Sequence, residues 1–236
     1  MNQAEFIREL ETELKPYITS WHHVSGFSHP NVLIYTNENP TLPSLASWGL
    51  IPHWVKNQVQ ANKIRNNTIN ARGESIFEKP SYRDAAKAKR CLISVDGFYE
   101  YHHKNGKTFP HFIHKKSEEP MTLAGLWSNW INKQTGKLLK TFTIVTVKAN
   151  PLLSKIHNNP KLKEARMPLL LTNDKADEWL NVSHDKTDTN RIKALMTPSE
   201  EELIAYTVRP LRGKKAVGNK PEASKQFFYD ELNELF

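Results

Sequence analysis

The chain has 236 residues, enough to bury a substantial core as one large domain or two small ones. A hydrophobic content of 38% and a charged content of 25% are typical of a soluble globular protein. No apolar stretch approaches the roughly 20 residues that span a bilayer, and Met1–Glu5 lacks the features of an export signal. We therefore expect no membrane contact and a cytoplasmic location. The one cysteine, Cys91, excludes an internal disulfide and a multi-cysteine metal site.

The charge balance is strongly basic, with a net charge of +8 and an isoelectric point of about 9.4. It favours a polyanionic partner such as nucleic acid, whose phosphates release counterions when a protein neutralises them. The lysines are scattered and form no tight basic block. The alternative is therefore a basic protein without such a partner.

The first half of the chain predicts helices and short strands. An amphipathic helix is indicated near the N-terminus by apolar residues at helical spacing, namely Phe6, Ile7, Leu10 and Leu14. A strand over 32–35 ends in a turn at 37–40, and a loop rich in proline and serine leads to Trp48. A short helix is then expected over 85–90 and a buried strand over 91–95.

The second half has the composition of strands joined by hairpins. Strands are predicted over 111–113, 121–127, 141–147, 167–171 and 204–208. The turns around 104–107 and 133–136 have hairpin chemistry. Helices are expected over 174–180 and from a capping box at 197–200, and the tail from about 221 is polar. This order indicates one α+β domain over 1–236 with a mostly antiparallel sheet. Because no glycine-rich phosphate loop follows a strand, we expect no nucleotide cofactor.

Two residues could move protons. Glu100 follows an aromatic pair, and a carboxylate desolvated by such neighbours would have a raised pKa and could act as an acid or base. His157 follows a predicted helical turn from Pro151 and could transfer protons near neutral pH. The alternatives are that Glu100 is a surface glutamate and that His157, one of 10 histidines, lies on the surface without a role. No histidine spacing suits a metal, so no metal site is predicted.

Two further segments could bind a ligand. Asn70 and Arg72 alternate with Ala71, so an extended backbone would aim both at one phosphate or sugar oxygen. The alternative is a turn asparagine and an Arg72–Glu74 ion pair. The aromatic hook of Trp48, Pro52 and Trp54 could stack on unpaired bases, or serve as a core staple, which we expect of one tryptophan. Cys91 is predicted to be a small buried residue rather than a nucleophile.

Taken together, seven phrases in order resemble the SRAP family (SOS response-associated peptidases, or abasic-site-processing proteins). They are Trp48-Gly49-Leu50-Ile51-Pro52-His53-Trp54, Asn70-Ala71-Arg72-Gly73-Glu74, Arg90-Cys91-Leu92-Ile93, Asp96-Gly97-Phe98-Tyr99-Glu100-Tyr101, Ile156-His157, Arg166-Met167-Pro168 and Ala216-Val217-Gly218-Asn219. The resemblance runs from about Trp48 to Asn219 and implies a twisted, barrel-like sheet with peripheral helices.

The resemblance also implies a function. Members bind single-stranded DNA at abasic sites, where an N-terminal cysteine forms a Schiff base and then a thiazolidine with the sugar aldehyde. By resemblance, Asn70 would position the N-terminal residue, and Glu100 and His157 would move protons during crosslinking and its reversal. Arg72 and Arg166 would hold phosphates, and the Trp48–Trp54 hook would pack on the flanking bases. No cofactor or metal is implied, and we expect a monomer.

The sequence departs from the family pattern in two places. Residue 2 is Asn2, and no cysteine precedes Cys91. We expect that the natural start lies upstream. Alternatively, the protein binds without crosslinking, or Cys91 acts as a substitute, although it lacks the α-amine that a thiazolidine needs. The second departure is the stretch 158–165, which separates His157 from Arg166 by more than the pattern predicts.

Three functions therefore compete. The first is a covalent abasic-site sensor with autoproteolytic N-terminal processing, an enzyme if the nucleophilic cysteine is present. The second is a non-covalent single-stranded DNA binding protein that uses the same groove. The third is a peptidase that acts on other proteins, which no Ser/His/Asp pattern in the sequence supports.

Overall fold

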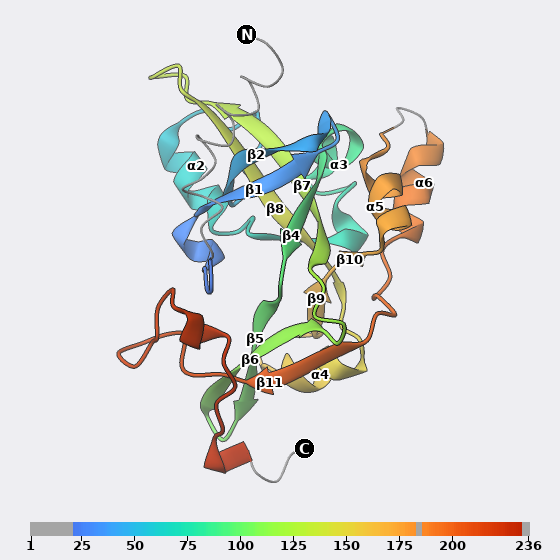
Figure 1. Cartoon of the computed structure of the whole chain (residues 1–236). Helices are drawn as coiled ribbons and strands as arrows, with labels where there is room; N and C mark the ends of the chain where they lie inside the picture. Colours follow the sequence, from blue (N-terminus) through green and yellow to red (C-terminus); the bar gives the residue numbers. More distant parts are fainter. Residues whose placement is uncertain (1–20, 183–185, 233–236) are drawn as a thin grey trace, which may run out of the picture.

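Two sheets placed end to end form the molecule, which is known from a computed structural model that describes residues 21–182 and 186–232. The larger sheet lies at the top of Figure 1 and the three-stranded sheet at the bottom. The helix predicted from Phe6 to Leu14 lies outside the described residues. Within the described ranges, no helix is long and apolar enough to cross a membrane.

Five strands of the larger sheet close into a barrel, in the order β7-β4-β1-β2-β8, because β8 also pairs with β7. Their bounds are β1 Asn31–Thr36, β2 Asn39–Trp48, β4 Arg90–Val95, β7 Met121–Ile131 and β8 Leu138–Lys148. Three short strands extend this sheet, namely β3 Asn70–Arg72, β9 Arg166–Pro168 and β10 Leu170–Leu171. Pairing is antiparallel except where β8 meets β2 and β3 in parallel. The predicted α+β fold with a mostly antiparallel, barrel-like sheet is thus confirmed.

The second sheet has the order β11-β6-β5, so β5 is an edge strand. Its strands are β5 Phe98–Lys104, β6 Lys107–Lys115 and β11 Leu203–Thr207. The predicted hairpin at 104–107 joins β5 to β6, and both Asn105 and Gly106 have positive φ, of 50° and 74°. Helices cover the margins of both sheets, namely α2 Gln58–Arg65, α3 Arg83–Ala88, α4 Pro151–Ile156, α5 Asn173–Leu180 and α6 Lys186–Ala194. Of these, α2 and α6 were not predicted.

The segment before Trp48 is strand β2 and not the predicted loop. Pro40 and Pro43 lie opposite a register shift in β1 between Ile34 and Thr36. On its other side, β2 meets β8 only at Ser47 and Trp48. The prolines therefore need not donate to a ladder, which is the condition under which strands tolerate them.

The helix predicted to start at Thr197 is also absent, and residues 197–200 form a bend and coil. The carboxylate of Glu201 pairs with Lys115 of β6 at 2.9 Å, and Leu203 begins β11. This pairing leaves too few residues for a helix, so tertiary contacts override the local capping signal. Smaller shifts occur elsewhere: the helix expected over 85–90 spans 83–88, and the strand over 167–171 is split at Leu169.

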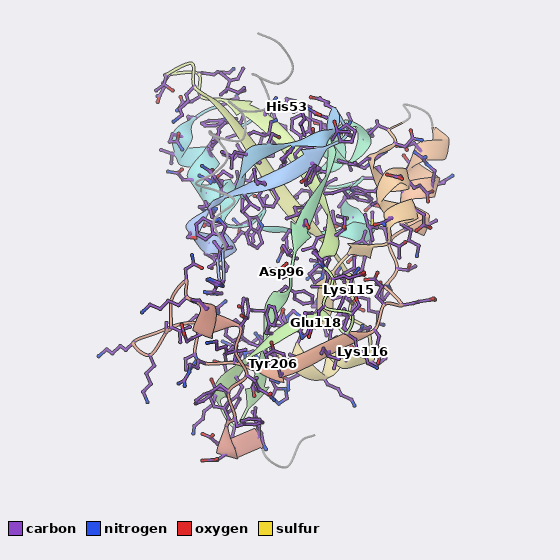
Figure 2. All side chains as sticks on the ribbon, viewed as in Figure 1. His53, Asp96, Lys115, Lys116, Glu118 and Tyr206 are labelled. Carbon is purple, nitrogen blue, oxygen red and sulfur yellow. The ribbon has the colours of Figure 1, made fainter. Side chains whose placement is uncertain are left out.

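A glycine lets the chain pass from one sheet to the other. Strand β4 ends at Val95 and β5 begins at Phe98, with Asp96 and Gly97 between them. Figure 2 places Asp96 between the barrel and the second sheet. A Cβ atom on Gly97 would lie 2.3 Å from the ring of Phe112, so a side chain there would push β5 out of place.

A buried ion pair holds α6 and the end of α5 against the barrel. The guanidinium of Arg90 binds both carboxylate oxygens of Asp188, at 2.9 and 3.0 Å, and the two side chains are 0% and 3% exposed. Its remaining N–H groups donate to the carbonyls of Ala86, Trp179 and Asn181. Each of the five donors thus has an acceptor, as a buried charge requires.

We expect Arg90→Met to lower the free energy of unfolding by about 3–5 kcal/mol, because the buried Asp188 carboxylate loses its bidentate partner and keeps Arg191, while three buried carbonyls lose their donor. Urea unfolding would measure the loss. Arg83→Met is the matched control, since Arg83 pairs with Asp84 at 3.8 Å on the surface and should cost under about 1 kcal/mol. Equal losses in the two variants would contradict this account.

Candidate functional site

A carboxylate and an imidazole meet at the free edge of β5. Glu100 Oε2 lies 3.4 Å from His157 Nδ1, and the two side chains are 25% and 18% exposed. The other oxygen of Glu100 accepts the backbone N–H of Tyr101 at 3.0 Å. Two of the segments that the sequence singles out therefore converge, through Glu100 and His157.

The contacts of His157 define its neutral tautomer. Nδ1 lies 2.8 Å from the carbonyl oxygen of Arg166 as well as near the Glu100 carboxylate. The carbonyl oxygen and the ionised carboxylate are acceptors. The backbone N–H of Arg166 also points at Nδ1, but from 3.4 Å, so the shorter contact to the carbonyl decides and we assign the hydrogen to Nδ1. In the neutral ring Nε2 then carries the free lone pair and is the atom that can take up a proton.

The pKa of Glu100 is raised above its usual range, chiefly because burial penalises the charged form. The charge of His157, the N–H of Tyr101 and the charges of Arg212 and His103 act in the opposite direction. A carboxyl group with a raised pKa can hold a proton nearer to neutral pH and release it to a neighbouring group, which is what proton transfer requires.

Arg166 ties the site to the barrel. Its guanidinium binds Glu74 through two hydrogen bonds of 2.9 and 2.7 Å. It also donates to Glu164 and to the hydroxyl and carbonyl oxygens of Thr146 in β8. All five N–H groups are thus engaged by protein acceptors. Glu74 consequently pairs with Arg166 and not with Arg72, and although burial raises its pKa, its hydrogen bonds and the charges of both arginines lower it overall.

Asn70 and Arg72 lie on β3 and face the same way, as predicted. Both are exposed, whereas Ala71 between them is buried. The carbonyl of Asn70 accepts the hydroxyl of Tyr82 at 3.1 Å. Within the described ranges, no hydrogen bond joins the Asn70 side chain to Glu100 or His157. Asn70 and Arg72 therefore present an amide and a cation to solvent on β3, which pairs with β8 on the side opposite β9.

The aromatic hook divides into buried and exposed parts. Trp48 is half-buried, donates its Nε1–H to the Ile69 carbonyl at 2.8 Å and stacks on Phe142. Pro52 is buried. Trp54 is 46% exposed and donates to the Pro80 carbonyl at 3.3 Å. Trp54 is thus the ring that can stack on a ligand, and Trp48 is the expected core staple.

Cys91 is fully buried, as predicted, and burial raises the pKa of its thiol. A thiol in that setting is a poor nucleophile. In the part of the chain that the structure describes, no group of three or more His, Cys, Asp or Glu side chains could hold a metal.

Two asparagines contribute contacts that the sequence did not reveal. Asn158 pairs with both backbone groups of His103, accepting its N–H at 2.6 Å and donating to its carbonyl at 3.0 Å. It thereby caps the free edge of β5 as another strand would. Asn219, which the sequence marks only as part of a family phrase, accepts the N–H groups of His22 and His23 at 2.7 and 3.1 Å. Neither contact has a local sequence signal, because the partners lie at least 55 residues apart.

Comparison with known proteins places the chain in a family. The family model for SOS response associated peptidase (SRAP) matches residues 3–215. Abasic site processing protein YoqW of Bacillus subtilis (strain 168) is 38% identical over 196 residues, which cover 81% of this chain and 80% of that protein. Abasic site processing protein HMCES of Gallus gallus is 32% identical over 173 residues, which cover 65% of this chain and 48% of that protein. The chain belongs to the SRAP family.

Two solved structures are similar in fold. The crystal structure of a protein from Bacteroides thetaiotaomicron has a TM-score of 0.80 and 33% sequence identity, covering 92% of this chain and 90% of that chain. A second, from Bordetella bronchiseptica, has a TM-score of 0.65 at 23% identity, covers 84% of this chain and 95% of that chain, and supports the fold alone.

We expect Asn158→Ala to open the edge of β5 beside the Glu100–His157 pair. A hydrogen bond of this kind is worth about 0.5–1.5 kcal/mol, so the His103 amide should exchange its hydrogen roughly 2- to 10-fold faster. Amide exchange followed by NMR would measure this. Asn159→Ala is the control, because among the described residues its side chain bonds only to the backbone N–H of Lys161, within its own loop. An unchanged exchange rate of the His103 amide in Asn158→Ala would show that Asn158 does not hold the edge of β5 closed.

Proposed function

We propose that this protein binds single-stranded DNA at abasic sites and links to them covalently, as a sensor of DNA damage. The observation that carries the proposal is the Glu100–His157 pair at the edge of β5, in a chain whose relatives are named abasic site processing proteins. The exposed Asn70 and Arg72, and the net charge of +8, suit an anionic sugar–phosphate ligand.

The reaction would proceed in two steps. The ring-opened abasic sugar presents an aldehyde, and an α-amine adds to it to form a carbinolamine, which loses water to give a Schiff base. A thiol on the same residue then adds to the imine carbon, its proton passes to the nitrogen, and a thiazolidine ring closes. Glu100 would donate the proton that lets hydroxide leave as water, and His157 would accept the proton released by the amine.

The remaining residues would position the DNA. Arg72, whose side chain is exposed, would contact a phosphate, and Trp54 would stack on a flanking base. Asn70 would orient the residue that supplies the amine. Trp48 and Pro52 would support the hook from within. Arg166, with its five donors engaged, would reach a phosphate only by releasing a carboxylate, so we propose that it chiefly holds His157 in place.

The nucleophile defines the alternative function. Residue 2 is Asn2, and Cys91 is buried. A chain without an N-terminal cysteine would bind single-stranded DNA non-covalently through the same residues. A denaturing gel after incubation with abasic single-stranded DNA distinguishes the two functions. The given chain is compared with a version extended to an upstream Met-Cys start, if the coding DNA has one. A shifted band with the extended version supports crosslinking, and no band with either supports the non-covalent binder.

We expect Glu100→Gln and His157→Ala to keep DNA affinity within about 2-fold while slowing crosslink formation or reversal by about 10²–10⁴-fold, the usual contribution of a proton-transfer group. Arg72→Ala should instead weaken binding and lower the dependence of affinity on salt. Fluorescence anisotropy and a gel time course would measure the two effects. Loss of binding in Glu100→Gln with normal binding in Arg72→Ala would reverse these assignments.

We also expect a pH dependence specific to Glu100. Because burial raises its pKa, Glu100 keeps its proton above the usual carboxyl range and loses it as the pH rises through the raised pKa. The ratio of the wild-type crosslinking rate to that of Glu100→Gln should therefore be constant at low pH and fall at higher pH. Ionisation of the amine is common to both proteins and cancels from the ratio. A ratio that does not change with pH would exclude Glu100 as the proton donor.

A further inference from the structure

Cations gather in one segment after β11. Residues 209–225, here called the basic loop, carry six cations and one acid. The cations are Arg209, Arg212, Lys214, Lys215, Lys220 and Lys225, and the acid is Glu222. The segment therefore has a charge of +5 of the protein's +8, leaving +3 for the other 219 residues. Although the lysines form no tight block, lysines and arginines together are concentrated in this segment.

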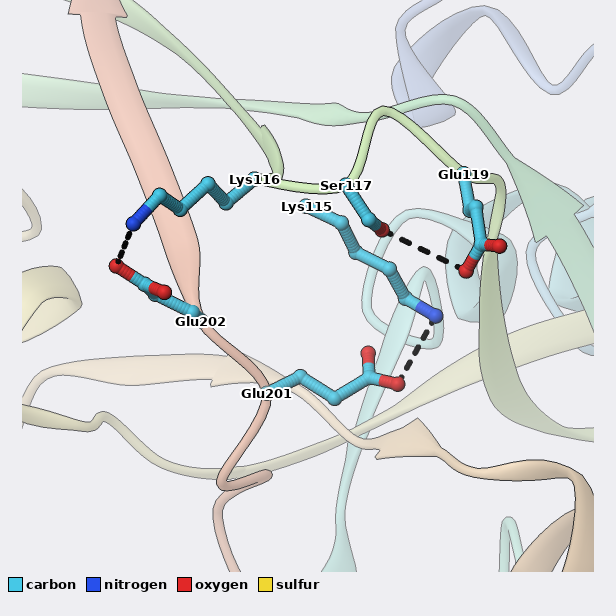
Figure 3. Close-up of a pocket in the computed structure, with 6 residues that line it drawn as sticks. All are labelled: Lys115, Lys116, Ser117, Glu119, Glu201 and Glu202. Carbon is cyan, nitrogen blue, oxygen red and sulfur yellow. Dashed lines mark hydrogen bonds and ion pairs between the residues drawn. The ribbon is translucent and has the colours of Figure 1, made fainter.

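These cations are available to a ligand. All six are exposed. Among the described residues, the only acid paired with any of them is Glu222, which lies 3.7 Å from Lys225. The surface depression in Figure 3 shows the opposite case, because Lys115 and Lys116 there are neutralised by Glu201 and Glu202 at 2.9 and 2.8 Å. An excess of six cations over one acid, and not a mere abundance of lysine, distinguishes the basic loop.

The basic loop begins beside the candidate site. The guanidinium of Arg212 lies 4.2 Å from the ring centre of Tyr101 on β5, and its charge acts to lower the pKa of Glu100. In Figure 1 the chain after β11 extends outward from the second sheet. Arg209, Lys215 and Lys220 line one depression on this loop. The basic loop thus places one cation beside β5 and three others around a depression on the surface.

An aromatic side chain accompanies these charges. Arg209 packs over the ring of Phe227 at 4.7 Å, and the next residue, Phe228, is 73% exposed. Basic residues with exposed aromatic rings are the combination that binds single-stranded nucleic acid, because phosphates pair with the cations while bases stack. An acidic peptide would pair with the cations, but acidic side chains have no ring that could stack on Phe228.

We propose that the basic loop binds the phosphates of the DNA strand where it runs away from the abasic nucleotide. This inference rests on the proposed function for the location of the lesion, while strand binding by the loop is independent of any covalent chemistry. Each phosphate contact on a single strand contributes about 0.7 to the slope of log affinity against log salt.

The test compares two triple variants with equal charge. Lys214→Ala/Lys215→Ala/Lys220→Ala removes three cations of the basic loop. Lys116→Ala/Lys133→Ala/Lys137→Ala removes three cations elsewhere and serves as the control. Affinity for unmodified labelled oligonucleotides of about 5 and 20 nucleotides is measured by anisotropy across a salt series. For the longer strand, the loop variant should bind about 10-fold or more weakly at low salt and lose roughly 2 from the salt slope.

The outcomes are distinct. A selective loss for the longer strand in the loop variant supports the proposal, whereas equal losses in the two triple variants would show a general charge effect and overturn it. Unchanged DNA affinity in the loop variant would also overturn it and would favour an acidic protein as the partner. Crosslinking of a short abasic oligonucleotide is measured in parallel. If neither the wild type nor a variant forms a crosslink, but the loop variant still binds the longer strand selectively more weakly, the proposed covalent function fails and the loop proposal stands.

Discussion

The hydrogen bonding of β8 is the constraint on which the other elements depend. A buried strand must pair the N–H and C=O groups of both its edges. Strand β8 does so with β7 and then β9 on one side, and with β2 and then β3 on the other. Thr146 is the point where β3 and β9 meet across β8, opposite Arg72 and Pro168. The register of one strand thus brings together two segments that are far apart in sequence.

From that point a series of contacts leads to the acid–imidazole pair. Glu74 follows β3 and binds the guanidinium of Arg166 on β9, and the carbonyl of Arg166 holds His157 Nδ1 beside Glu100. Each link involves a charged group or a ring nitrogen with more than one partner, so the imidazole has little freedom to rotate. Such preorganisation matters for proton transfer, because a misplacement of about 1 Å can cost roughly 100-fold in rate.

The features that could be predicted from the sequence are those set by neighbouring residues, such as turns and the facing of side chains. The Asn105-Gly106 turn fixes a hairpin by its positive φ angles, and Ala71 between two polar residues fixes the facing of Asn70 and Arg72. Helix α6 and the coil at 197–200 were missed because Asp188 and Glu201 meet their partners, Arg90 and Lys115, only in the fold. The contacts of Asn158 and Asn219 were not predicted for the same reason, because each joins residues that are far apart in the sequence.

The stretch 158–165 between His157 and Arg166 is held in place at both of its ends. Loop length affects closure entropy only weakly, so its ends decide the geometry. At one end the N–H of Ala149 binds the carbonyl of Ala165 at 3.0 Å, and at the other His157 Nδ1 lies 2.8 Å from the carbonyl of Arg166. Within the loop, Asn158 binds the edge of β5. The residues of this stretch therefore lie between fixed ends, and Asn158 closes the edge of β5, the strand that carries Glu100.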